Sequence, residues 1–178
     1  MPDVNMKANI AEALFKFSQT KNIDKITVKD LVTECNISRQ SFYYHFQDIF
    51  DVSEWSLRQE MLKTLQKSSN VETPQEAIYI FIHKMIENQF LIRKLYTSDH
   101  RERLEKIMIQ TIRDYIQSLI QHKVKGSRLS HQDLDFLLDF YSLGLTEYMM
   151  LHINEDIDEK YLSEQLFRLM DGQLNIFQ

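Results

Sequence analysis

The scarcity of glycine and proline is the feature that most limits what this chain can fold into. The 178 residues include 3 Gly and 2 Pro, whereas average usage is about 7% Gly and about 5% Pro. Sandwiches, barrels and Gly-rich phosphate-binding α/β folds need more turns than five such residues can supply. The sequence therefore predicts an all-α fold of helices joined by short polar loops.

Length and cysteine content narrow the class further. A domain takes about 100–200 residues, so we expect one domain, or a small domain fused to a larger one. The single Cys35 excludes an internal disulfide framework and a multi-cysteine zinc site, and it fits a reducing compartment. Residues 1–17 lack the pattern of a signal peptide, and no stretch of 18 apolar residues is present. We therefore expect a cytoplasmic protein without a membrane partner.

Apolar residues at helical spacing, preceded by capping residues, predict about nine helices and no strand. Thr27 with Asp30, Thr73 with Glu76, and Ser130 with Asp133 are spaced as N-terminal caps. Asn36 suits the left-handed position that ends a helix, and Gly172 ends the last one. The predicted helices run over about residues 6–18, 27–35, 39–46, 48–67, 74–95, 99–122, 130–153 and 158–170, and residues 123–127 form a predicted loop.

The segment over residues 27–46, TVKDLVTECNISRQSFYYHF, carries the clearest functional signal. Two short helices joined by a turn of about four residues have the spacing of a helix-turn-helix, whose second helix enters the DNA major groove. Arg and Gln side chains pair with purine edges, and hydroxyls and helix N-termini bind phosphates. The predicted DNA-binding residues are Lys7, Thr27, Val28, Lys29, Ser38, Arg39, Gln40, Ser41, Tyr43, Tyr44 and His45.

Two further observations bear on this interpretation. The alternative is an ordinary helical hairpin with a solvated polar face, but two adjacent exposed tyrosines on a short helix have no packing role that would explain them. The net charge of −5 argues against a nucleic-acid partner. A DNA-binding function therefore has to come from the local motif.

Residues 10–52 resemble the N-terminal DNA-binding domain of TetR-family transcriptional regulators. The motifs that carry the resemblance are T-V-x-D-L at 27–31 and S-R-x-x-x-Y-Y-H-F at 38–46. The resemblance implies a homodimer that binds palindromic double-stranded DNA. It also implies a helix-turn-helix domain over residues 1–50 and a C-terminal effector-binding and dimerisation domain over residues 51–178.

One departure from the family pattern affects the expected strength of DNA binding. Members of the family commonly carry a phosphate-binding Lys at the start of the fourth helix, where this chain has Ile49. Residues 1–52 hold six Lys and Arg and seven acidic residues, a net charge of −1. We therefore expect weak non-specific DNA binding with a shallow salt dependence.

The C-terminal half is similar to one subgroup, the regulators akin to the dihydroxyacetone kinase operon regulator. Residues 140–145, Tyr148 and residues 48–55 carry this similarity. Some members of that subgroup act through a protein partner, so the resemblance leaves a protein partner as an alternative to a small-molecule effector.

Aromatic, Met and His residues in the C-terminal half are candidates for an effector pocket, although residues of this kind more often form core. The candidate pocket residues are Trp55, Phe81, His83, Met108, Tyr115 and Tyr141. His83 and Glu87 are four residues apart, but two ligands are more typical of a solvated face, and we predict no metal and no cofactor. His100 is expected to be exposed near a helix end, and Cys35 to be a small core residue.

The last two predicted helices carry leucine-rich stripes, which predict a four-helix bundle between two subunits. The alternative is that these stripes form core within one chain. Gly144 costs about 1 kcal/mol inside a helix relative to Ala, which predicts a close approach of two helices there. The predicted interface residues are Leu134, Leu138, Tyr141, Leu145, Met149, Leu162, Leu166 and Leu169.

The sequence thus supports two hypotheses of function. The first is a homodimeric DNA-binding repressor that a small-molecule effector controls. The second is a TetR-like co-regulator that acts through a protein partner docked on the C-terminal domain. We expect no enzymatic activity, because no nucleophile–base pair, metal cluster or Gly-rich loop occurs at a diagnostic spacing.

Overall fold

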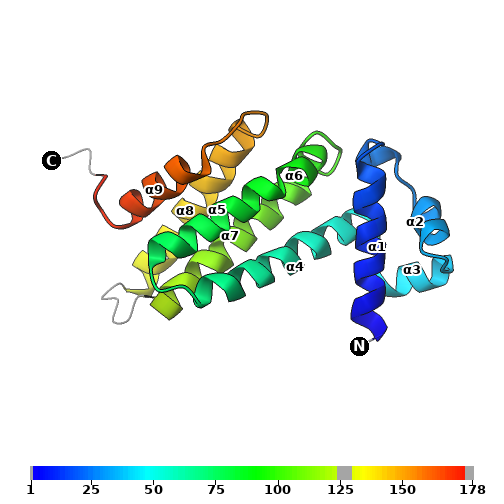
Figure 1. Ribbon diagram of the computed structural model, residues 1–178, viewed down its shortest axis with the longest axis horizontal. Helices are drawn as coiled ribbons and strands as arrows, with labels where there is room; N and C mark the ends of the chain where they lie inside the picture. The colour runs from blue at the N-terminus through cyan, green and yellow to red at the C-terminus, as the bar shows by residue number, and fades with distance from the viewer. Residues whose placement is uncertain (1, 124–129, 175–178) are drawn as a thin grey trace. The chain divides into compact units, whose positions relative to one another are not determined.

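The computed structural model describes residues 2–123 and 130–174, and every regular element in these ranges is a helix (Figure 1). The predicted all-α fold is confirmed. No described helix combines the length and the apolarity needed to cross a membrane. The elements are α1 Pro2–Ser18, the 3-10 helix η1 Ile23–Lys25, α2 Val28–Glu34, α3 Arg39–His45, α4 Ile49–Ser69, α5 Pro74–Glu87, α6 Gln89–Tyr96, α7 Arg101–Lys123, α8 His131–Leu151 and α9 Glu159–Met170.

The chain forms two compact units, each made of separate stretches of sequence. Unit 1 comprises residues 1–59 and 90–107, and unit 2 comprises residues 60–89 and 108–178. In unit 1, α1 packs against α2 and α2 against α3 (Figure 1). The core of this unit includes Ile10, Leu14, Leu31, Phe42, Phe46 and Phe50, all almost fully buried.

Unit 2 is built around α5, α8, α9 and the later parts of α4 and α7. Helix α5 packs along α9. Buried side chains include Ala77, Phe81, Met108, Tyr115, Leu138 and Met149. The buried Tyr115 hydroxyl lies 2.7 Å from both the Ser68 hydroxyl and the Ala77 carbonyl oxygen, and burial raises the pKa of Tyr115 to about 12.

The helix caps follow the local sequence signals. The Thr27 hydroxyl accepts the Asp30 N–H at 3.2 Å, and the Asp30 carboxylate accepts the Thr27 N–H at 2.9 Å. Ser130 and Asp133 form the same reciprocal pair at the start of α8. Asn36 is left-handed with φ 52°, and Gly172 has φ 75°.

The structure differs from the predicted elements in three places. The helix predicted over residues 74–95 is two helices, because Asn88 caps α5 by donating its side-chain amide to the Lys84 carbonyl at 2.9 Å. Helix α7 begins at Arg101, after the Ser98 hydroxyl accepts the His100 N–H at 3.1 Å. The 3-10 turn η1 was not predicted, and it places the buried Ile23 in the core. Most of the predicted loop over residues 123–127 lies outside the described residues.

Replacing Thr27 with Ala is expected to lower the free energy of unfolding by about 1 kcal/mol, the usual cost of losing an N-cap. The matched control is Thr33→Ala, an exposed position inside the same helix, where Ala has the better helix propensity. Chemical denaturation of both variants measures the difference. Equal stability of the two variants would show that the Thr27 cap contributes nothing.

The same cap has an expected pH dependence. Hydrogen bonds from the Thr27 backbone and hydroxyl lower the pKa of Asp30 below its ordinary value of 3.8. A carboxylate with a lowered folded-state pKa contributes its full stability above the ordinary value and loses it as pH falls through the folded value. The difference in the free energy of unfolding between the wild-type protein and Asp30→Asn should therefore be constant near neutral pH. It should shrink as the pH falls below the ordinary pKa of 3.8.

Candidate nucleic-acid interface and C-terminal grooves

The short helix α3 presents one buried face and one exposed face. Its N-cap Ser38 accepts the Ser41 N–H at 3.0 Å, and Phe42 is fully buried. On the other face Tyr43 is 58% exposed and Tyr44 is 78% exposed. Arg39 and Gln40 are exposed with them, whereas Ser41 and His45 are half-buried. Four of the predicted base-contacting side chains are therefore free of the core.

Contacts from α1 and α4 fix the C-terminal end of α3. The Phe46 ring lies 6.1 Å from the Phe42 ring and 6.0 Å from the Trp55 ring. The Lys7 ammonium lies 5.3 Å from the centre of the Phe46 ring, which brings this predicted phosphate contact beside α3. Trp55 lies in unit 1, whereas the other five candidate pocket residues lie in unit 2.

The N-terminus of α2 differs in one respect from the prediction. The Thr27 hydroxyl donates its proton to the Asp30 carboxylate at 2.9 Å, so that proton would have to leave Asp30 before it could be donated to a phosphate. Among the described hydrogen bonds, the Ser38 hydroxyl acts as an acceptor, which leaves its proton for a phosphate. Lys29 is exposed in the first turn of α2, and Val28 is half-buried.

Acidic groups occupy the start of α4, where the family pattern has a Lys. The Asp51 N–H donates to the Asp48 carboxylate at 2.7 Å, and the Gln47 N–H donates to the Asp51 carboxylate at 2.8 Å. Ile49 is half-buried. Two carboxylates lie at this helix start and one of them binds the Asp51 N–H, so it is a poor site for a phosphate.

The predicted interior effector pocket is closed in this structure. The Phe81 and Tyr115 rings stack with their centres 4.3 Å apart, and Met108 is buried. The gap beside them has a volume of about 30 Å³, far below the roughly 300–1,000 Å³ of small-molecule sites. Tyr141 lines both this gap and a surface groove between α8 and α9. Of the six candidate residues, Phe81, Tyr115 and Tyr141 line this gap together.

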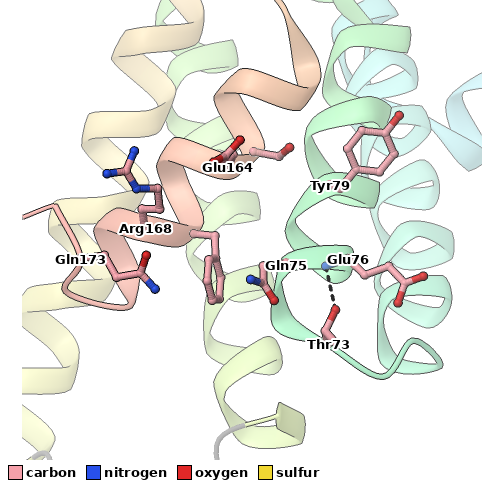
Figure 2. A pocket seen from close by; sticks show the side chains of 9 residues that line it. Thr73, Gln75, Glu76, Tyr79, Glu164, Arg168 and Gln173 are labelled. Atoms are coloured by element: carbon pink, nitrogen blue, oxygen red, sulfur yellow. Dashed lines mark hydrogen bonds between the residues drawn. The ribbon is translucent and has the colours of Figure 1, made fainter.

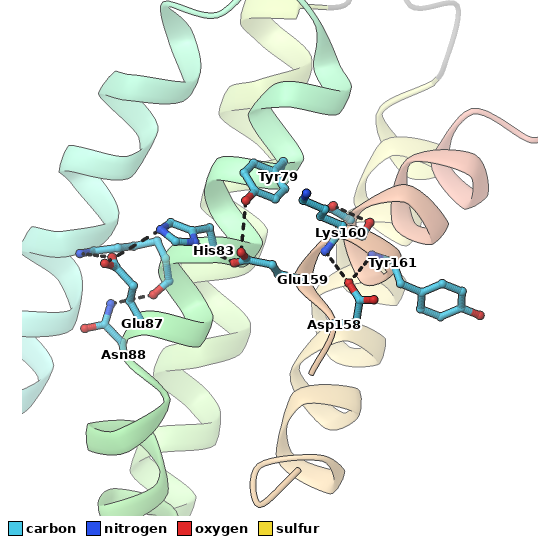
Figure 3. Close-up of polar contacts among 10 residues, drawn as sticks. Tyr79, His83, Glu87, Asn88, Asp158, Glu159, Lys160 and Tyr161 are labelled. Atoms are coloured by element: carbon cyan, nitrogen blue, oxygen red, sulfur yellow. Dashed lines mark hydrogen bonds and ion pairs between the residues drawn. The ribbon is translucent and has the colours of Figure 1, made fainter. Parts of the chain in front are cut away.

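His83 lies on the surface of unit 2 rather than in a pocket. Its Nδ1 is 2.7 Å from a Glu159 carboxylate oxygen, and the Tyr79 hydroxyl donates to the other Glu159 oxygen at 3.2 Å (Figure 3). Glu87 is 4.0 Å from the other ring nitrogen. Among the described residues, no three or more His, Cys, Asp or Glu side chains are grouped so that they could hold a metal ion.

Two surface grooves are present in unit 2. A polar groove of about 560 Å³ lies between the start of α5 and the later part of α9, and Figure 2 shows Gln75 of α5 and Arg168 of α9 among the side chains that line it. An apolar groove of about 380 Å³ lies between α8 and α9. The apolar groove is lined by Phe140, Tyr141, Gly144, Leu145, Tyr148, Tyr161, Leu162, Gln165, Leu166, Leu169 and Leu174.

The residues predicted to form a dimer interface divide into two groups. Leu138 and Met149 are buried within the chain's own core, whereas Leu145 and Leu162 are buried but line the apolar groove. Leu134, Tyr141 and Leu166 are half-buried, and Leu169 is 41% exposed. The large apolar side chains of α8 and α9 that are exposed are Phe136, Phe140, Leu143, Tyr148, Leu151, Tyr161 and Leu169. We call this set of residues the exposed α8–α9 face.

Gly144 has no close neighbour from another helix in the part of the chain that the structure describes. Among the described residues, no atom lies within 4 Å of the position that a Cβ would take, although Gly144 lines the apolar groove. The predicted close approach is therefore absent between helices of one chain.

Comparison with known proteins identifies the class of this chain. A family model for the C-terminal region of TetR-type transcriptional regulators matches residues 72–172, more than half of the chain. The chain belongs to this family and is a transcriptional regulator of TetR type, as the sequence motifs predicted.

One curated relative and one solved structure illustrate what the chain is similar to. The dhaKLM operon transcriptional activator DhaS of Lactococcus lactis subsp. lactis (strain IL1403) is 21% identical over 98% of this chain and 97% of its own length. A solved structure of a dihydroxyacetone kinase operon activator DhaS has a TM-score of 0.71 and 19% identity, covering 98% of this chain and 99% of that one. The structural likeness shows a shared fold.

Proposed function

We propose that the protein is a sequence-specific DNA-binding regulator that binds its operator as a homodimer. The observation that carries the proposal is α3, a seven-residue helix with Phe42 fully buried and Arg39, Gln40, Tyr43 and Tyr44 exposed. A helix held by its apolar face can offer its polar face to base edges in the major groove. In this proposal residues 1–50 form the DNA-binding domain and residues 51–178 the dimerisation and control domain.

The proposed dimer forms through the exposed α8–α9 face. A partner helix inserted into the 380 Å³ apolar groove would build a four-helix bundle from two helices of each subunit. Gly144 supports this choice, because the open space above it admits a close helix of a second copy.

Two modes of control are compatible with this proposal, a protein partner and a small-molecule effector. The closed interior around Tyr115 supports the second hypothesis, a co-regulator that responds to a protein partner docked on the C-terminal domain. The 560 Å³ polar groove keeps the first hypothesis, a small-molecule effector, as the alternative. The relative named as an activator supports an activator at least as well as the repressor predicted from sequence.

A mobility-shift experiment at low salt, on DNA flanking the protein's own gene, tests the proposal. We expect a sequence-dependent shift, with or without an added partner protein, because α3 reads bases and the net charge of −5 disfavours non-specific binding. Scrambled DNA of the same length is the control. Equal binding to both DNAs, or to neither under every condition, would contradict the proposal.

A further inference from the structure

The corner between α3 and α4 is held by a side chain from α7. This corner consists of Gln47 and Asp48, which connect the last residues of the recognition helix to the first residue of α4. The two carboxylate oxygens of Asp48 have different partners: one accepts the Asp51 N–H at 2.7 Å, and the other accepts Arg103 Nη1 at 2.8 Å. Asp48 thus joins a local helix cap to a residue 55 positions away in the chain.

Arg103 is held in place by an aromatic ring as well as by Asp48. Its guanidinium lies 4.1 Å from the centre of the Phe50 ring, and His100 contacts the same ring with centres 5.1 Å apart. Phe50 is 1% exposed, so it offers a fixed surface to the guanidinium plane. A planar cation stacked in this way keeps its geometry with little loss of entropy. The sequence predicted that His100 is exposed, but the residue is half-buried and its ring contacts Phe50.

The position of the recognition helix depends on its two ends, because a helix of seven residues is not stable by itself. At its N-terminal end the Ile37 N–H donates to the Val32 carbonyl at 3.0 Å and Asn36 adopts its left-handed turn. At its C-terminal end the Phe46 N–H donates to the Phe42 carbonyl oxygen. The chain then continues into the α3–α4 corner, where Arg103 binds Asp48.

We propose that Arg103 is a positioning residue for operator binding, which fixes the α3–α4 corner through Asp48 and Phe50 without contacting DNA. The proposal rests on the DNA-binding function proposed above. The lowered pKa of Asp48 agrees with it: burial raises that pKa, but the hydrogen bonds from Arg103 and the Asp51 N–H lower it by more, so the carboxylate is ionised at neutral pH.

The decisive experiment compares Arg103→Gln with Asp48→Asn in operator affinity, measured by fluorescence anisotropy at one salt concentration. Asn retains the side-chain oxygen that caps α4, so Asp48→Asn removes the ion pair and keeps the cap. If net charge alone governs affinity, Arg103→Gln weakens binding and Asp48→Asn strengthens it, because DNA is an anion. Positioning predicts that both variants weaken binding, by about three- to fivefold.

The control is Arg101→Gln, which removes the same charge from the same turn of α7. Arg101 donates to Glu105 in its own helix at 2.7 Å and packs over Tyr96, and we expect its loss to change affinity less than twofold. The double variant of Arg103 and Asp48 should bind no worse than either single variant. Opposite signs for the two single variants, additive losses, or an equal effect of Arg101→Gln would each overturn the proposal.

A second measurement separates this proposal from the proposed function. In hydrogen exchange of the DNA-free protein, Arg103→Gln should speed exchange of the Gln47 and Asp51 amides, whereas Arg101→Gln should not. If the wild-type protein binds no operator, the proposed function fails while this measurement still tests whether Arg103 holds the corner. Arg103→Lys keeps the charge but loses the planar stacking, and we expect it to restore less than half of the lost protection. Full protection in Arg103→Gln would contradict the role of Arg103.

Discussion

Replacing Phe140 and Leu143 together with Glu is expected to leave the protein monomeric at concentrations where the proposed dimer of the wild-type protein forms. The two side chains are 59% and 53% exposed in one chain, so the substitutions should not disturb the fold of the subunit. In the proposed four-helix bundle the same positions would be covered, and each would then bury an unpaired carboxylate. Burying polar groups without partners costs several kcal/mol, so we expect the dissociation constant of the dimer to rise by about 1,000-fold or more.

Sedimentation velocity across a range of concentrations measures this change. The matched control is the double variant Phe15→Glu and Leu62→Glu, which adds the same charge at positions 52% and 60% exposed on α1 and α4. The control should remain dimeric. A dimer that survives the Phe140 and Leu143 substitutions would place the interface away from the exposed α8–α9 face.

The second large effect is expected at the exposed face of α3. Arg39→Ala should weaken operator binding by about 1–3 kcal/mol and relax the preference at one base pair, if Arg39 reads a base edge. Lys29→Ala should instead weaken binding to all sequences alike and reduce the slope of log affinity against log salt by about one, as expected for a phosphate contact.

Binding titrations against the operator and against single-base variants, each at three salt concentrations, separate the two effects. Lys25→Ala provides the control, because Lys25 is exposed in the same unit but lies in η1 rather than in α2 or α3. If Arg39→Ala lowers affinity equally for every sequence, Arg39 binds the backbone and our assignment of its role is wrong.

The parts of the fold that were predicted correctly depend on residues close together in the chain. The Thr27 and Ser130 caps, the left-handed Asn36 and the exposed tyrosines of α3 each follow from signals within a few positions. Such signals act through local hydrogen bonds, so a single sequence is enough to recognise them.

Other features depend partly on residues that are distant in the chain. The break after α5 is supported by Gln89, whose side-chain amide donates to the carbonyls of Ile153 and Glu155, more than 60 positions away. Helix α8 carries apolar residues on two sides, and periodicity cannot tell which side meets the chain's own core. The pairing of Asp48 with Arg103 likewise joins residues that no local pattern connects.

The division of α4 and α7 between the two compact units has a consequence for cutting the protein. Each helix begins in unit 1 and ends in unit 2, and unit 1 takes residues 90–107 from the middle of the chain. A fragment ending at residue 50 would lack Trp55, His100 and Arg103, which contact Phe46 and Phe50 in the intact chain. The proposed DNA-binding end is therefore not expected to be a detachable module, and on the proposed function a transfer of its specificity would require exchanging surface residues of α3 rather than a terminal segment.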